Sequence, residues 1–73
     1  MPVKISDGFM CLEIGGRIIS TATERPDGWW EVTYWPRFFD RNQAITALTV
    51  TELLSDGYGN DDPLIVALRD ELR

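Results

Sequence analysis

The residues of this chain that could take part in chemistry are arginines, tryptophans, carboxylates and one thiol. Its 73 residues include no histidine, so the usual proton shuttle and the usual base for a serine or cysteine nucleophile are missing. Cys11 is the single cysteine and lies in an apolar stretch with no neighbouring cation, which is typical of a buried, inert thiol. The sequence therefore predicts that the protein is not an enzyme.

The carboxylates between residues 56 and 62 are the group that invites a metal hypothesis. In a helix–loop–helix calcium site starting at Asp56, the third position would hold a ligand, the sixth a glycine and the twelfth a glutamate. These positions hold Tyr58, Asp61 and Ala67 instead. One cysteine and no histidine also fail to provide a structural zinc site. We expect no metal and no cofactor, and we interpret these carboxylates as helix caps and solvated loop residues.

Arginines and tryptophans alternate between residues 17 and 41, an arrangement that would allow stacking on nucleic-acid bases. The residues that such an interface would use are Arg25, Trp29, Arg37 and Arg41. However, the chain carries 12 acidic and 7 basic residues, for a net charge of −5, and this balance repels phosphate backbones. A sheet-type DNA-binding protein is therefore an alternative hypothesis. The competing structural interpretation pairs Arg37 and Arg41 with Glu31, Asp40 or a helix carboxylate at the surface.

The acidic excess lies in residues 52–73, which hold six acidic and two basic side chains. Solvated helix ends and a loop explain this excess most simply, although it could also steer the chain to a basic partner. No hydrophobic signal segment and no apolar run of membrane-spanning length occurs. A lone cysteine also fits a reducing compartment. We expect a cytoplasmic protein without a membrane partner.

Two turn motifs predict the strands that precede the arginine-rich segment. Gly15-Gly16 separates apolar stretches at residues 9–14 and 17–23, as in a two-residue hairpin. The Arg25-Pro26-Asp27-Gly28 sequence suits a three-residue hairpin loop with a bulge, leading into a third strand over residues 29–35. Residues 1–8 are expected to form a flexible arm with a turn at Asp7-Gly8.

Two helices are predicted after the strands. Pro36 marks the end of the third strand, and Asp40 with Gln43 forms a capping box for a helix over residues 41–55. The stripe expected to be apolar comprises Ala44, Ala47, Leu48, Thr51 and Leu54, with Val50 beside it. Gly57 is expected to end this helix. Asp62 and Pro63 start a short C-terminal helix with an apolar stripe of Leu64, Ile65, Leu68 and Leu72.

The predicted fold class is α+β, with a three-stranded antiparallel β-meander followed by a main α-helix and a short C-terminal helix in a single small domain spanning residues 1–73. The strand register leaves one conflict. A simple turn at Gly15-Gly16 places Met10, Leu12 and Ile14 on the opposite sheet face from Ala22, Trp30 and Val32. Either a bulge flips the first strand, or both sheet faces are partly buried against a partner or a second copy.

Part of the sequence resembles a recurring pattern in short proteins of actinobacteria and their bacteriophages. The residues that carry the resemblance are Gly28-Trp29-Trp30-Glu31-Val32, then Trp35-Pro36-Arg37, then the Arg41-Asn42-Gln43-Ala44-Ile45-Thr46-Ala47-Leu48 segment. It covers residues 27–54, under half of the chain. The resemblance implies a bacterial or phage cytoplasmic setting and brings no activity with it.

Together these observations favour a non-enzymatic protein-interaction module over an enzyme. A phage-encoded accessory protein that binds a bacterial host protein is one form such a module would take. A homodimeric structural protein is a further alternative, and we expect a homo-oligomer because apolar residues exceed what one sheet face and one helix stripe need. The predicted interaction surface comprises Trp29, Trp35, Arg37, Arg41, Ile45 and Leu53.

Overall fold

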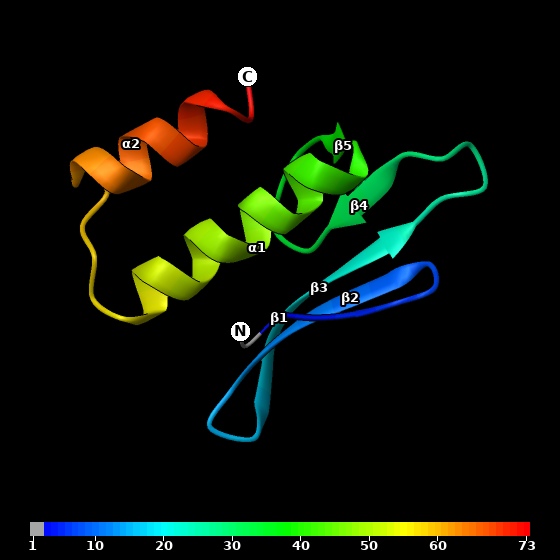
Figure 1. The fold of residues 1–73 in the computed structure, drawn as a ribbon, viewed down its shortest axis with the longest axis horizontal. Coiled ribbons are helices and arrows are strands. Elements are labelled where there is room, and N and C mark those ends of the chain that lie inside the picture. Colours follow the sequence, from blue (N-terminus) through cyan, green and yellow to red (C-terminus); the bar gives the residue numbers. More distant parts are fainter. Residues whose placement is uncertain (1–2) are drawn as a thin grey trace.

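The computed structural model describes residues 3–73, which form an antiparallel sheet with two helices on one side of it (Figure 1). In chain order the elements are β1 (Val3–Ser6), β2 (Phe9–Ile14), β3 (Arg17–Glu24), β4 (Trp30–Val32), β5 (Phe38–Phe39), α1 (Arg41–Ser55) and α2 (Pro63–Asp70). Each strand is hydrogen-bonded to its sequence neighbour, so the sheet order is β1-β2-β3-β4-β5. The α+β class is as predicted.

The predicted three-stranded meander is wrong, because the sheet has five strands. At one edge of the sheet, β1 leads into a turn at Asp7-Gly8 and the chain returns as β2, antiparallel to β1. Val3 pairs with Leu12, and Ser6 pairs with Phe9. Residues 3–6, assigned from the sequence to a flexible arm, are therefore an edge strand, while residues 1–2 of that arm lie outside the described part. The pairing with β2 buries Val3, a tertiary contact that a stretch of four residues does not reveal by itself.

The second correction concerns the strand expected over residues 29–35. It ends at Val32, because Tyr34 takes a left-handed backbone conformation with φ of 71°. The Trp35 N–H then donates to the Val32 carbonyl at 3.1 Å, closing a tight turn. After Pro36 the chain comes back as β5, where Phe39 pairs with Trp30. The sheet therefore continues past the proline that was expected to end it.

A bulge resolves the register conflict. Gly15 and Gly16 form the predicted two-residue turn, both with positive φ, and Ile14 pairs with Arg17 across it. The register then shifts, because Glu13 pairs with Ile18 whereas Leu12 pairs with Ser20. One extra residue in β3 therefore moves Met10 and Leu12 onto the same sheet face as Ala22, Trp30 and Val32.

The first helix begins and ends where the sequence predicts. The Asp40 carboxylate accepts the Gln43 backbone N–H at 2.7 Å, and the Gln43 side-chain oxygen accepts the Asp40 N–H at 3.1 Å. This capping box satisfies two donors that a helix start leaves unpaired. At the other end, N–H groups of Gly57 and Tyr58 bond back to the carbonyls of residues 54 and 53, the pattern of a Schellman motif.

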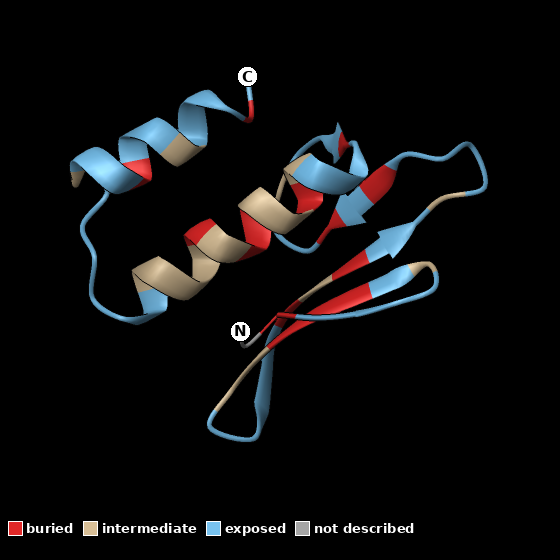
Figure 2. Ribbon diagram, viewed as in Figure 1, coloured by how far each residue is buried: buried red, intermediate tan, exposed pale blue. Residues whose placement is uncertain are grey.

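The core lies between one sheet face and α1 (Figure 2). Ala44, Ala47, Leu48 and Val50 are the buried helix residues, while Thr51 and Leu54 of the predicted stripe are half-buried. Of the described elements, α2 packs only against α1, and its predicted cap at Asp62 is present. Neither helix in the described part of the chain is long and apolar enough to cross a membrane.

Candidate functional site

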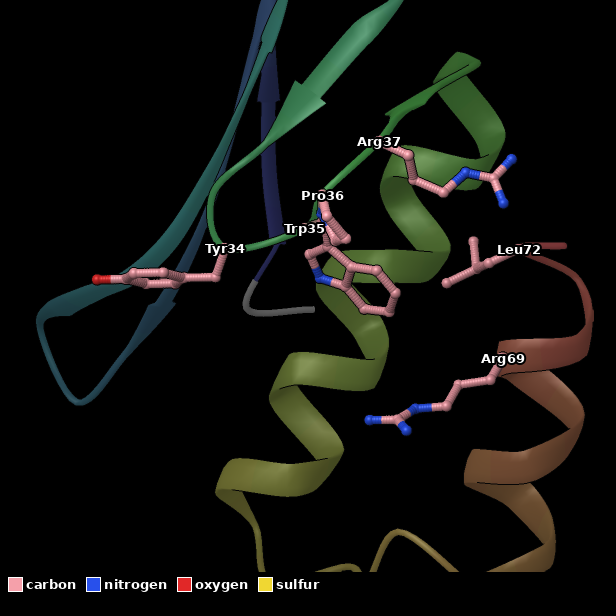
Figure 3. A pocket seen from close by; sticks show the side chains of 6 residues that line it. All are labelled: Tyr34, Trp35, Pro36, Arg37, Arg69 and Leu72. Carbon is pink, nitrogen blue, oxygen red and sulfur yellow. The ribbon is translucent and has the colours of Figure 1, made fainter.

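An open cleft of about 420 Å³ lies between the β4–β5 connection and the C-terminal end of α2 (Figure 3). Its lining residues are Tyr34, Trp35, Pro36, Arg37, Arg69 and Leu72. We call this feature the arginine cleft. It lies in the size range of small-molecule and side-chain binding sites, about 300–1,000 Å³.

The aromatic wall of the cleft is set by the turn that ends β4. Tyr34 adopts a backbone conformation that is uncommon for a residue other than glycine, asparagine or aspartate. This turn directs the next residue inward, so Trp35 is half-buried and packs against the core. The Trp35 ring meets the Phe39 ring edge-on, with 5.6 Å between the centroids and an interplanar angle of 74°. Tyr34 itself is 91% exposed, and its ring points away from the other lining side chains (Figure 3).

Arg37 is positioned by the same buried ring. Its guanidinium carbon lies over Phe39 at 5.2 Å from the ring centroid, within the range of a cation–π contact. Phe39 is fully buried and pairs with Trp30 in the sheet. The sheet therefore holds both Trp35 and Arg37 through one rigid aromatic side chain.

The opposite wall comes from the end of α2. Arg69 extends from this helix toward the cleft, and Leu72 lies between Arg69 and Arg37 (Figure 3). After the helix, the Leu72 N–H donates to the Arg69 carbonyl at 3.0 Å, and this turn directs Leu72 into the core cluster. The Gln43 side-chain nitrogen also donates to the Glu71 carbonyl at 3.5 Å. The glutamine of the α1 capping box thereby helps to fix the end of α2.

The two arginines of the cleft have no carboxylate partner within 4 Å among residues 3–73. The ion pairs among residues 3–73 join Lys4 to Glu13, Arg25 to Asp27, and Arg73 to Asp70. Acidic side chains outnumber basic ones by 12 to 7, so anionic partners are abundant in this chain. The surface interpretation of Arg37, an ion pair with a nearby carboxylate, is therefore not what the structure shows.

The lining of the cleft is suited to binding an anionic or apolar group. Its lining offers two guanidinium forks, a half-buried indole and the apolar surfaces of Pro36 and Leu72. Guanidinium groups bind carboxylates or phosphates with paired hydrogen bonds. The lining contains no carboxylate, thiol or imidazole, the groups that most often transfer protons or attack a substrate.

The structure brings together only part of the predicted interaction surface. Trp35 and Arg37 line the cleft. Arg41 is exposed at the start of α1, whereas Ile45 and Leu53 are half-buried along that helix, and Ile45 packs against the core. Trp29 is exposed at the β3–β4 turn and does not line the cleft.

Two lining residues, Arg69 and Leu72, were missed as site residues. In the sequence Arg69 is an ordinary charge on the solvated side of a short helix, and Leu72 belongs to its apolar stripe. Asp62 and Pro63 predict the helix that carries Arg69, but nothing local predicts that its far end faces the β4–β5 connection. That juxtaposition depends on how α2 packs against α1.

The arginine and tryptophan residues proposed for DNA binding do not form one surface. Arg25 is engaged internally, because its guanidinium binds Asp27 at 3.2 Å and lies 4.1 Å from the centroid of the Phe38 ring. Arg25 and Trp29 belong to the β3–β4 turn, Arg37 to the arginine cleft, and Arg41 to the start of α1. The outer sheet face beside Arg25 also presents Glu31.

The outer sheet face, away from the helices, is another region where apolar side chains are exposed. Its exposed apolar side chains are Phe9 at 40%, Ile18 at 61% and Phe38 at 45%. The bulge removes the need to bury both sheet faces, since it gathers Met10 and Leu12 with the rest of the core. The homo-oligomer stays a prediction, and this outer face is one surface available to a second copy.

The described part of the chain contains no cluster of three or more histidine, cysteine or acidic side chains placed to hold a metal ion. Compared with known proteins, the chain matches no family model, no curated sequence and no solved structure. Its function must therefore be argued from the arginine cleft itself.

Proposed function

We propose that this protein is a non-enzymatic interaction module that binds a protein partner through the arginine cleft. The observation that carries this proposal is the pair of guanidinium groups, from Arg37 and Arg69, that line an open cleft without a carboxylate partner among the described residues. In a chain with an acidic excess, two such arginines in one concavity provide binding capacity for an external group.

The composition of the cleft supports a protein partner. Arginine, tryptophan and tyrosine are the residue types most enriched at the energetic centres of protein interfaces. Trp35 supplies a rigid ring anchored on Phe39, and Arg37 is held over the same ring. Because both side chains are positioned before any partner arrives, little rotamer entropy remains to be lost on binding.

The setting that we propose is the cytoplasm of a bacterium or of a phage-infected host cell, where a phage-encoded accessory protein would meet a host protein. The single cysteine supports a reducing compartment. The resemblance to short actinobacterial and phage proteins supports the same setting.

A photo-crosslinking experiment tests the proposal. Pro36 lines the cleft and is exposed, so p-benzoyl-phenylalanine at this position places the reactive group beside both arginines. The full chain carrying this probe is irradiated in an actinobacterial lysate and the adducts are resolved by mass. We expect a discrete protein adduct that falls several-fold with Arg37→Gln and with Arg69→Gln, since each variant removes one charge while keeping a long polar side chain.

Arg17→Gln is the matched control, because Arg17 is exposed at the Gly15-Gly16 hairpin and does not line the cleft. It removes the same charge and should leave the adduct unchanged. Adducts that are equally strong in all four proteins would show non-specific capture. That result, or the absence of any adduct, would contradict the proposal.

A further inference from the structure

We infer that the arginine cleft recognises a short peptide segment in which a carboxylate side chain neighbours an apolar one. This inference rests on the proposed function and names the chemistry of the partner. It combines the two guanidinium groups, the apolar surfaces between them, the size of the cleft and the charge of the surrounding surface.

The carboxylate follows from the two arginines. Arg37 comes from the β4–β5 connection and Arg69 from α2, and Leu72 lies between them with the two guanidinium groups pointing to opposite sides of the view (Figure 3). A guanidinium group presents a planar fork of donors that matches the two oxygens of a carboxylate. Each fork can therefore bind the carboxylate of an acidic side chain that enters the cleft.

The apolar neighbour follows from what lies between the arginines. Trp35 and Pro36 contribute indole and pyrrolidine surfaces to the lining, whereas Leu72 is 4% exposed and adds little open surface. A fully hydrated ion such as free phosphate would leave these surfaces without partners, whereas an aromatic or aliphatic side chain would cover them. The ligand therefore has an apolar body as well as an anionic group.

The cleft size and surrounding charge select a short peptide over a nucleic acid. A volume of about 420 Å³ accommodates one or two side chains. Arg69 is followed directly by Asp70 and Glu71. A phosphate backbone that reached Arg69 would pass these two carboxylates and be repelled. A single carboxylate bound to one of the arginines avoids most of this repulsion.

Amide NMR of the full chain, uniformly labelled with nitrogen-15, tests the inference with defined probes. The probe peptide is acetyl-Ala-Phe-Asp-Ala-amide, and its matched control is acetyl-Ala-Phe-Asn-Ala-amide, which has nearly the same shape without the charge. We expect the first to shift the Trp35 indole N–H and the Leu72 amide, and the second to bind at least about tenfold more weakly, since hydrogen bonds between charged groups are the stronger ones. Arg37→Gln and Arg69→Gln should each weaken the first peptide several-fold, with Arg17→Gln as the unchanged control.

A third peptide, acetyl-Ala-Ala-Asp-Ala-amide, tests the apolar part and should bind several-fold more weakly than the phenylalanine peptide. Equal binding of the aspartate and asparagine peptides would show that the cleft does not recognise a carboxylate. Inorganic phosphate or a thymidine octanucleotide binding more tightly than the aspartate peptide would show that the ligand is not a peptide. No shift at the cleft with any peptide would overturn the inference as a whole. The proposed function is judged separately, because an arginine-dependent adduct at Pro36 can persist when every one of these peptides fails.

Discussion

Replacing Asp40 with alanine should destabilise the whole domain through the start of α1. The Asp40 carboxylate accepts the Gln43 N–H at 2.7 Å, and loss of such a cap costs about 1 kcal/mol, with a range of about 0.5–2. The exposed carboxylate also interacts favourably with the helix dipole, which adds about 0.3 kcal/mol at an exposed site. The reciprocal bond from the Asp40 N–H to the Gln43 side chain at 3.1 Å uses the backbone, so alanine retains it. The expected loss is therefore about 1.3 kcal/mol.

For a domain of this size, about 1 kcal/mol shifts the melting temperature by about 4–8 °C. Asp40→Ala should lower it by about 5–10 °C, measured by thermal unfolding followed with far-ultraviolet circular dichroism. Asp40→Asn keeps a capping oxygen and loses only the charge, so its shift should be about 2 °C.

Asp61→Ala is the matched control, since Asp61 is an exposed carboxylate in the loop between the helices and caps neither of them. If Asp40→Ala melted at the temperature of Asp61→Ala, the helix would not depend on this cap. The start of α1 and the position of the adjoining Arg37 segment would then be incorrectly assigned.

Four further changes test other parts of the structure. The Trp29 N–H, which donates to the Asp27 carboxylate, and the neighbouring arginine lower the pKa of Asp27. Because this folded-state pKa lies below the unfolded one, the turn contributes stability above the unfolded pKa and loses it as pH falls through the folded pKa. Carboxyl-carbon NMR should place the titration midpoint of Asp27 at a lower pH in the native chain than in the urea-unfolded chain, and equal midpoints would contradict this. Leu48→Ala should cost about 2–5 kcal/mol in urea unfolding, since Leu48 is fully buried, and a loss below about 1 would place it outside the core. Tyr34→Gly removes the cost of a left-handed conformation at a non-glycine residue, about 1–2 kcal/mol. Glycine also raises the entropy of the unfolded chain, which lowers stability by about 0.5–1 kcal/mol. The melting temperature should therefore stay level or rise, and a fall would show that Tyr34 is not strained. If copies associate through the outer sheet face, sedimentation equilibrium should show a dimer that Phe38→Glu dissociates, and a monomer at every concentration would remove the predicted homo-oligomer.

The features that the sequence determines are those set by neighbouring residues. The Asp40 and Gln43 capping box, the Gly15-Gly16 turn and the Asp62-Pro63 helix start all involve groups within a few residues of one another. Their geometry follows from local backbone and side-chain chemistry, so the predictions of both helix starts and of the two hairpin turns are confirmed. The α+β class follows from the same local preferences.

The edges of the sheet depend on long-range pairing instead. Residues 3–6 were expected to belong to a flexible arm, but Val3 is buried opposite Leu12. Residues 29–35 look like one strand until Tyr34 takes a left-handed conformation and β5 returns beside β4. In both places a non-local contact outweighs a weak local preference.

The arginine cleft belongs to the tertiary structure for the same reason. Its walls come from the β4–β5 connection and from the end of α2, which meet because α2 packs against α1 and Leu72 enters the core. The sequence alone identified Trp35 and Arg37 by their residue types. Arg69 could be identified only from the packing of the two helices, which places it opposite Trp35 and Arg37. The neighbours of an exposed arginine in the sequence of a short helix do not indicate which residues it faces.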